Sequence, residues 1–249
     1  MSGAYREIRR DAPDSGTAVL LLHGILSAPQ FFDFLLNAVP DGTAVSAPLL
    51  AGHGGTAGAL SRAAMAQWKK QVRKTFLDLS RNRRRTVMIA HSMGTLFALE
   101  AAREFPQSIR RMILLDVPLY AKMTLPGAFS FLKTAFGAPQ DASRALAAAQ
   151  AYSIAPDANL LHYAGWIPRY LELFAEMRAV RGMISEIRVP AVIFQSEKDE
   201  LVAARSARLL RGNPAFQVRL MRNASHFDYP LREQERIRRA VRQAILSDS

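Results

Sequence analysis

The sequence contains no cysteine, which excludes disulfide bonds, thiolate metal ligands and cysteine nucleophiles. No apolar run approaches the length of about 20 residues that a membrane-spanning helix needs. The first 16 residues, MSGAYREIRRDAPDSG, are polar and lack the apolar stretch of a secretory signal. We therefore expect a soluble protein of the cytoplasm.

Acidic residues are few in comparison with basic ones. The chain has 21 Asp and Glu against 33 Lys and Arg, which gives a formal net charge of +12. Such a surplus can attract nucleic acid or an anionic membrane surface. The arginines, however, form small scattered groups without interleaved aromatic residues, at 83–85, 110–111 and 236–242. We expect a solvated basic surface and no nucleic-acid partner, with weak attraction to an anionic membrane surface as the alternative.

The chain has 249 residues, of which 49% are hydrophobic, enough for one large domain or two small ones. Short apolar runs rich in β-branched residues alternate with longer helical patterns, which is typical of a parallel sheet covered by helices. The strands that we expect are 17–22, 43–46, 86–90, 112–115, 189–195 and 217–221, with 5–9 as a further candidate. A surface helix is expected to turn one apolar face inward, formed by Met65, Trp68, Val72, Phe76 and Leu79.

The alternation of strands and helices stops between residues 119 and 186. This segment shows no convincing strand, and four prolines separate short helical pieces: Pro126, Pro139, Pro156 and Pro168. A structureless loop of this length is uncommon in a compact domain. We therefore predict a helical lid, or cap, at 119–186, inserted into a core formed by residues 1–118 and 187–249.

The stretch VMIAHSMGTLFALEAA, residues 87–102, places a polar His-Ser pair between an apolar run typical of a buried strand and one typical of a buried helix. A tight turn there would hold Ser92 at its apex, and the small residues Ala90 and Gly94 would let strand and helix approach closely. This is the geometry of the GxSxG nucleophile elbow, here with alanine in place of the first glycine. A serine in a turn can also be structural, so the motif alone leaves both roles open.

A serine nucleophile needs a general base. Two histidines follow Ser92 in the chain: His162, inside the predicted lid, and His226, directly after the last expected strand. We expect His226 to be the base, because a loop at that position can return to the edge of the sheet.

The base in turn needs a carboxylate that orients it. Asp199 follows the strand 189–195 by a few residues, in a loop that we expect to open a helix at about Leu201. Asp116, at the end of the strand 112–115, is the alternative acid. We interpret the neighbouring Glu197 and Glu200 as solvated charges.

The negative oxygen of a tetrahedral intermediate would need backbone N–H donors that are fixed before reaction. We predict that these are the N–H of Met93, which follows Ser92, and the N–H of Ile25, in the loop after the strand 17–22. The side chain of His23 in that loop is expected to be structural.

Five segments, in this order and at this spacing, resemble the α/β-hydrolase superfamily and in particular its carboxylesterase and monoacylglycerol-lipase-like branch: AVLLLHG, APLLAGHG, AHSMG, KDE and ASH. The resemblance spans nearly all of the chain outside the predicted lid. It implies an α/β-hydrolase fold, with a mostly parallel central sheet and helices on both faces, and a catalytic triad of Ser92, Asp199 and His226. It also implies that the loop 52–54 forms part of the wall of the site, with His53 in a structural role.

The predicted lid is rich in aromatic residues, of which we assign four to substrate binding: Phe129, Phe136, Trp166 and Tyr170. An apolar cover over Ser92 would suit an acyl chain, because burial stabilises by roughly 0.8 kcal/mol per CH₂. The alternative is that these residues pack the lid onto the core.

We therefore predict a serine carboxylesterase or lipase that hydrolyses neutral carboxylic esters with an apolar acyl group through an acyl-enzyme intermediate. The expected partner is a small-molecule ester, and the chemistry needs no metal or organic cofactor. An acyltransferase, a thioesterase or a C–C bond hydrolase would use the same triad. A binding protein that keeps the scaffold without its activity is a further alternative, and the sequence leaves the oligomeric state open.

Overall fold

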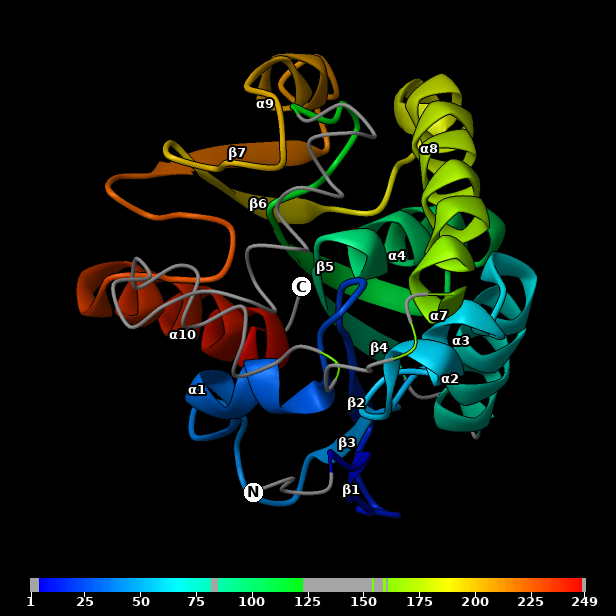
Figure 1. Ribbon diagram of the computed structural model, residues 1–249. Helices are drawn as coiled ribbons and strands as arrows, with labels where there is room; N and C mark the ends of the chain where they lie inside the picture. Colours follow the sequence, from blue (N-terminus) through cyan, green and yellow to red (C-terminus); the bar gives the residue numbers. More distant parts are fainter. Residues whose placement is uncertain (1–4, 82–84, 123–153, 155–158, 160, 248–249) are drawn as a thin grey trace.

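The computed structural model describes residues 5–81, 85–122, 154, 159 and 161–247. Within these residues, seven strands form one sheet in the order β1-β3-β2-β4-β5-β6-β7 (Figure 1). The strands are β1 (Ile8–Arg10), β2 (Thr17–Leu22), β3 (Ala44–Ala47), β4 (Arg85–His91), β5 (Ile109–Leu115), β6 (Ala191–Ser196) and β7 (Phe216–Met221). All neighbouring strands are parallel except β1 and β3, which pair antiparallel.

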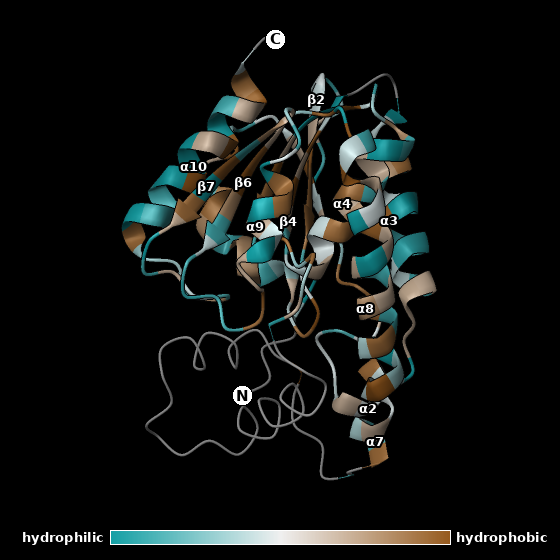
Figure 2. Ribbon diagram, turned by 90° about the horizontal axis from the view of Figure 1, so that it is seen from above, coloured by the Kyte–Doolittle hydropathy of each residue, from teal (hydrophilic) through white to brown (hydrophobic). Residues whose placement is uncertain are grey.

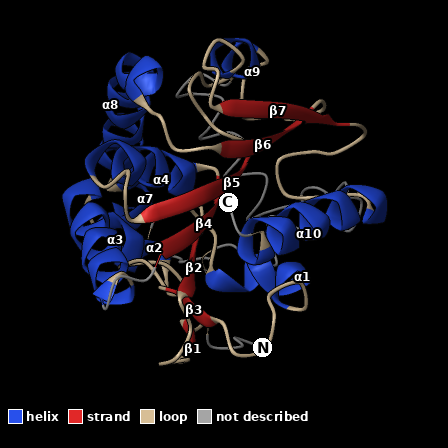
Figure 3. Cartoon of the chain, turned by 180° about the vertical axis from the view of Figure 1, so that it is seen from behind, coloured by secondary structure: helices blue, strands red, loops and turns tan. Residues whose placement is uncertain are grey.

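Helices cover both faces of this sheet. The 3₁₀ and α-helices are η1 (Pro29–Phe32), α1 (Asp33–Leu36), α2 (Ala57–Ser61), α3 (Met65–Leu79), α4 (Met93–Glu104), α7 (Leu161–Ala164), α8 (Trp166–Met183), η3 (Ile184–Glu186), α9 (Arg205–Leu210) and α10 (Leu231–Leu246). Figure 3 shows α3, α4 and α8 on one face and α1 and α10 on the other. This architecture confirms the expected α/β class, with a mostly parallel central sheet between two layers of helices.

The core consists of two apolar layers, one on each side of the sheet. The central strand β4 is buried along its length except at Arg85, as expected for a parallel strand covered on both faces. On α3 the predicted inward face is buried at Met65, Trp68, Val72 and Phe76. Figure 2 shows the corresponding pattern, with apolar strands in the middle and polar residues on the outer surfaces of α3 and α10.

The strand β5 begins at Ile109, earlier than the expected start at residue 112. Two arginines interrupt the apolar pattern there, and one of them has partners at the start of β2 and at the end of α10. Arg110 donates to the hydroxyl of Thr17 and to the carbonyl of Ile245 at 3.2 Å each, and also to the carbonyl of Ser247. These bonds tie the start of β5 to the end of α10.

The helix α9 begins at Arg205, so the helix start expected at about Leu201 is wrong. The backbone N–H groups of Leu201 and Val202 both donate to Asp199 Oδ1 at 2.8 Å. A side chain that accepts from these two N–H groups forms a local turn in place of the first helical turn.

The segment 119–186, predicted to be a lid, lies between β5 and β6 in the chain. Its described part contains α7, α8 and η3, and α8 packs against α3 and α4. That these helices belong to a lid stays a prediction. Among the described helices, none has both the length and the apolar character needed to cross a membrane. The cytoplasmic location also stays a prediction.

Candidate active site

Ser92 occupies the turn between β4 and α4, where its backbone has φ 51° and ψ −125°. Such a conformation is strained for a residue with a side chain, at a cost of about 1–3 kcal/mol, and is typical of functional positions. The N–H of Ser92 donates to the carbonyl of Leu115 at 3.0 Å. The end of β5 therefore fixes the turn, and the serine side chain stands at the carboxyl end of the central strand.

Two glycines allow other segments to approach this turn. A Cβ atom at Gly94 would lie 2.2 Å from the carbonyl oxygen of Leu22, so only glycine fits where α4 begins beside the end of β2. A Cβ atom at Gly24 would lie 2.8 Å from Ser92 Cβ. The loop after β2 therefore passes directly beside the serine.

The three side chains of the predicted triad form one line of hydrogen bonds. Ser92 Oγ lies 2.9 Å from His226 Nε2, and His226 Nδ1 lies 2.9 Å from Asp199 Oδ2. All three residues are buried. The structure thus brings together the hydroxyl, the imidazole and the carboxylate that the sequence pattern singled out.

The carboxylate determines which nitrogen of His226 carries the proton. A carboxylate oxygen accepts, so in the neutral ring Nδ1–H donates to Asp199 and the lone pair of Nε2 faces the hydroxyl of Ser92. Burial of the imidazole opposes its protonation, but the charge and hydrogen bond of Asp199, together with the charges of Asp116 and Glu200, outweigh burial and raise the pKa of His226 to about 9. The imidazolium that forms when the base accepts a proton is therefore stabilised.

Asp116, the alternative acid, has a different set of partners. Its carboxylate accepts from the N–H of Ser196 at 2.6 Å, from the Ser196 hydroxyl at 3.0 Å and from the Tyr229 hydroxyl at 2.8 Å. Burial and then the nearby charge of Asp199 raise the pKa of Asp116 to about 8. Asp116 therefore braces the ends of β5 and β6, while Asp199 provides the hydrogen bond to the imidazole.

One group of side chains in the described part of the chain has the spacing of a metal site. Ligand atoms of His91, Asp116 and His226 all lie within 4.8 Å of one another. Both ring nitrogens of His226 already have hydrogen-bond partners, and the Asp116 carboxylate already accepts three hydrogen bonds. Two of the three side chains are therefore already engaged with other protein groups, and the set fits a metal ion poorly.

The two predicted oxyanion donors come from segments that adjoin the serine in the chain or in space. Met93 is the first residue of α4, where backbone N–H groups have no partner within the helix. Ile25 follows Gly24 in the loop that passes beside Ser92. Their role as oxyanion donors stays a prediction.

His23 holds that loop in place. Its Nδ1–H donates to the carbonyl of Gly24 at 2.9 Å, and its Nε2 accepts from the N–H of Leu50 at 3.1 Å. Burial lowers the pKa of His23 to about 4, so the ring is neutral. His53 is also buried, with its ring edge against His23 at a centroid distance of 4.9 Å.

The aromatic residues assigned to substrate binding are only partly within the described structure. Phe129 and Phe136 lie outside the described residues. Trp166 is fully buried and donates from Nε1 to the carbonyl of Ala57 at 2.9 Å, and Tyr170 belongs to the same apolar layer. Trp166 therefore joins α8 to α2, and a role for Trp166 or Tyr170 in substrate binding stays a prediction.

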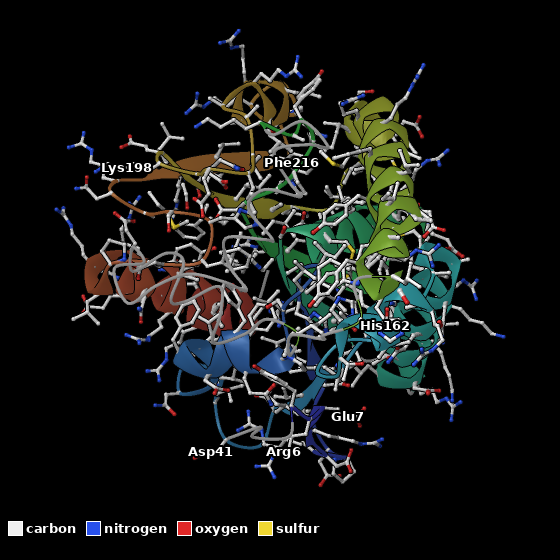
Figure 4. The ribbon with its side chains drawn as sticks, viewed as in Figure 1. Arg6, Glu7, Asp41, His162, Lys198 and Phe216 are labelled. Carbon is white, nitrogen blue, oxygen red and sulfur yellow. The ribbon has the colours of Figure 1, made fainter. Side chains whose placement is uncertain are left out.

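His162 lies on α7 and packs against α2 (Figure 4). A Cβ atom at Gly58 of α2 would lie 2.7 Å from its Nδ1. The Nε2 of His162 lies 3.3 Å from the side-chain nitrogen of Asn159. The hydroxyl of Ser92 faces His226 instead.

Sequence reasoning missed two side chains that contact the backbone of His226. His91 Nε2 lies 2.9 Å from the carbonyl oxygen of His226. Glu200 Oε2 accepts from the N–H of His226 at 3.2 Å, so its interpretation as a merely solvated charge is wrong. The only signal in the sequence was adjacency, because His91 precedes Ser92 and Glu200 follows Asp199.

Both the sequence and the fold of the chain resemble those of known proteins. A sequence model of the alpha/beta hydrolase family matches residues 19–240. No curated protein sequence matches the chain. The three solved structures described next are 15–17% identical to the chain, a level that shows the fold alone.

Three of these structures come from lipases or esterases. The first belongs to a study of LipS and LipT, two metagenome-derived lipolytic enzymes, and has 17% identity, a TM-score of 0.73 and coverage of 97% of this chain and 98% of that chain. A monoacylglycerol lipase of Paleococcus ferrophilus has 17% identity, a TM-score of 0.66 and the same coverage. A structure from a study of carboxylesterases of Nitrososphaera gargenis has 15% identity, a TM-score of 0.71 and coverage of 98% and 95%.

Proposed function

Because the chain belongs to the alpha/beta hydrolase family and has its fold, we propose that it is a serine hydrolase that cleaves neutral carboxylic esters with an apolar acyl group. One observation carries the proposal. The hydroxyl of Ser92, held in a strained turn, lies 2.9 Å from the nitrogen of an imidazole whose other nitrogen is bonded to a buried carboxylate. This is the arrangement that activates a serine hydroxyl as a nucleophile.

The proposed reaction starts when Ser92 Oγ attacks the ester carbonyl carbon and His226 Nε2 takes the hydroxyl proton. The imidazolium keeps its Nδ1–H bond to Asp199, and the N–H groups of Met93 and Ile25 hold the oxyanion. His226 then gives the proton from Nε2 to the departing alcohol oxygen. Water, deprotonated by the same nitrogen, attacks the carbonyl carbon of the acyl-enzyme. The bond from that carbon to Ser92 Oγ then breaks, Oγ takes the proton back from Nε2, and the acid is released.

Similar solved structures support an ester substrate, because one is described as a monoacylglycerol lipase and another comes from a study of carboxylesterases. The acidic groups near Ser92 argue against a cationic substrate. The carboxylates of Asp199 and Asp116 are buried and bonded to protein donors, which leaves neither of them to bind a cation on the substrate.

The test is a comparison of two serine variants on p-nitrophenyl esters. Ser92→Ala is expected to lower kcat by about 10⁶-fold, because removal of a triad nucleophile has an effect of that order. It should also abolish labelling by a fluorophosphonate probe. Ser80→Ala is the matched control, since the Ser80 hydroxyl lies 3.3 Å from Thr86 Oγ1, beside the opposite end of β4.

The acyl preference is read from a series of esters from acetate to decanoate. If the acyl chain is buried, kcat/KM should rise by up to about fourfold per CH₂, which corresponds to about 0.8 kcal/mol. Full activity of Ser92→Ala would overturn the assignment of the nucleophile. If kcat/KM fell as the acyl chain lengthened, the proposal of an apolar acyl group would be wrong, while the serine mechanism would stand.

A further inference from the structure

The backbone of His226 is held on both sides by side chains that are the immediate chain neighbours of its triad partners. The His226 carbonyl accepts from Nε2–H of His91, the residue before Ser92, at 2.9 Å. Its N–H donates to Glu200, the residue after Asp199, at 3.2 Å. The two segments that position the hydroxyl and the carboxylate therefore also position the peptide groups of the base.

The ring of His91 has little freedom to move. His91 is the last residue of β4, is fully buried, and pairs with Leu115 in the register of β4 and β5. Its ring stacks on Phe31 with a centroid distance of 4.0 Å and an interplanar angle of 23°. On another side it lies 4.9 Å, between centroids, from the ring of His226. A donor on this ring is thus fixed by the central strand and by the helix η1.

The protonation state of His91 follows from its surroundings. Burial, and then the nearby charge of His226, lower the pKa of His91 well below its ordinary value, so the ring is neutral. A carbonyl oxygen only accepts, which places the proton of His91 on Nε2 and leaves Nδ1 as an acceptor. Within the described residues, that buried Nδ1 has no hydrogen-bond partner.

An unpaired buried nitrogen destabilises a protein by about 1–3 kcal/mol. A phenylalanine at position 91 would keep an aromatic ring next to Phe31 and carry no unpaired nitrogen. Stacking therefore does not require a hydrogen-bond donor at position 91, whereas the bond to the carbonyl of His226 does.

We propose that His91 is a positioning residue, whose Nε2–H bond to the carbonyl of His226 keeps the imidazole of His226 in line between Ser92 and Asp199. The inference rests on the proposed serine-hydrolase function. Because His91 is fully buried, it offers no surface to a substrate. Its loss should therefore lower kcat and leave KM nearly unchanged, since a displacement of a reacting group by about 1 Å can lower the rate about 100-fold.

The experiment compares two substitutions that separate the ring from the donor. His91→Phe keeps a ring on Phe31 and removes the donor, and we expect it to lower kcat about 10- to 100-fold with KM changed less than about twofold. His91→Gln removes the ring but places an amide N–H close to the position of Nε2, and we expect kcat to recover to within about fivefold of wild type. Thermal unfolding checks that both variants are folded.

A second readout does not depend on turnover. In protein labelled with ¹⁵N-histidine, the pKa of His226 is followed by NMR, and contact with Asp199 holds it above the ordinary value near 6.5. We expect this pKa to fall toward 6.5 in His91→Phe and to stay raised in His91→Gln. If the wild-type protein cleaved no ester, the proposed function would fail, and the titration of His226 would still decide the role of His91.

Two results would overturn the role of His91. One is a folded His91→Phe variant with wild-type kcat and an unchanged His226 titration. The other is a folded His91→Gln variant that loses as much kcat as His91→Phe. Should His91→Phe not fold, His91→Asn replaces it, because its amide is too short to reach the carbonyl and should show the same losses.

Discussion

The hydroxyl of Ser92 and the Nε2 of His226 lie 2.9 Å apart although 134 positions separate them in the chain. The topology of the sheet accounts for this distance. Ser92 follows β4, His226 follows β7, and parallel strands bring their carboxyl ends to the same edge. Open α/β sheets bind ligands along that edge. Substitutions around the contact between Ser92 and His226 therefore test the site.

The two buried aspartates at this edge should differ sharply in their effect on activity. Asp199→Asn replaces the acceptor of the His226 Nδ1–H bond and favours the wrong tautomer of the imidazole, so we expect kcat to fall by about 10³- to 10⁴-fold. In Asp116→Asn the amide oxygen can still accept from Ser196, and we expect a loss of stability of about 1–2 kcal/mol with kcat within about threefold of wild type. Steady-state kinetics on a p-nitrophenyl ester measure kcat for both variants, and thermal unfolding measures their stability. A larger loss of kcat in Asp116→Asn than in Asp199→Asn would reverse the assignment of the acid.

Activity should increase with pH on the acid side of its profile. The imidazolium of His226 cannot take the proton of Ser92, so kcat/KM rises as the ring deprotonates and levels off above a pKa of about 9. Glu200 contributes to this raised pKa through its charge. Glu200→Gln keeps an acceptor for the N–H of His226 and removes the charge, so its acid limb should move to lower pH.

The control for this shift is the neighbouring carboxylate. Glu197 is exposed, and Glu197→Gln removes the same charge from the same loop. Its pH profile of kcat/KM should follow that of the wild type. If both variants moved the limb equally, a general change in surface charge would explain the result better than the contact between Glu200 and His226.

The close approach of α4 to β2 makes position 94 intolerant of any side chain. Gly94→Ala would place a Cβ atom 2.2 Å from the carbonyl oxygen of Leu22, and we expect a loss of about 1–3 kcal/mol or more in the free energy of unfolding. Gly182→Ala in α8 is the matched control, because its Cβ atom would meet no atom within 4 Å. Alanine favours a helix over glycine by about 0.5–1 kcal/mol. In denaturant unfolding, Gly94→Ala should therefore lower the free energy of unfolding and Gly182→Ala should raise it. A Gly94→Ala variant as stable as the wild type would contradict the close packing of α4 against β2.

Some parts of this molecule could be predicted because a local pattern reports them. The strand β4 and the helix α4 are long apolar runs, and the small residues at Ala90 and Gly94 mark the turn between them. The start of β5 could not be read in this way. Arg110 is polar within a strand, and its bonds to Thr17 and Ile245 come from residues far away in the chain.

The site shows the same division between local and distant information. The chain order of serine, acid and histidine pointed to Ser92, Asp199 and His226, which the fold brings together. The contacts of His91 and Glu200 with the backbone of His226 depend on how the loops after β4, β6 and β7 approach each other. A backbone carbonyl or N–H leaves no trace in the type of residue that carries it, so no sequence pattern predicts these partners.

The bonds that Arg110 makes with the carbonyls of Ile245 and Ser247 hold the last turn of α10 at the start of β5, while Ser92 stands near the finish of that strand. A solid support or fusion partner joined after α10 would thus be attached at the end of the sheet opposite Ser92. Immobilisation through this point should preserve turnover, whereas tethering through the loop that bears His226 should not.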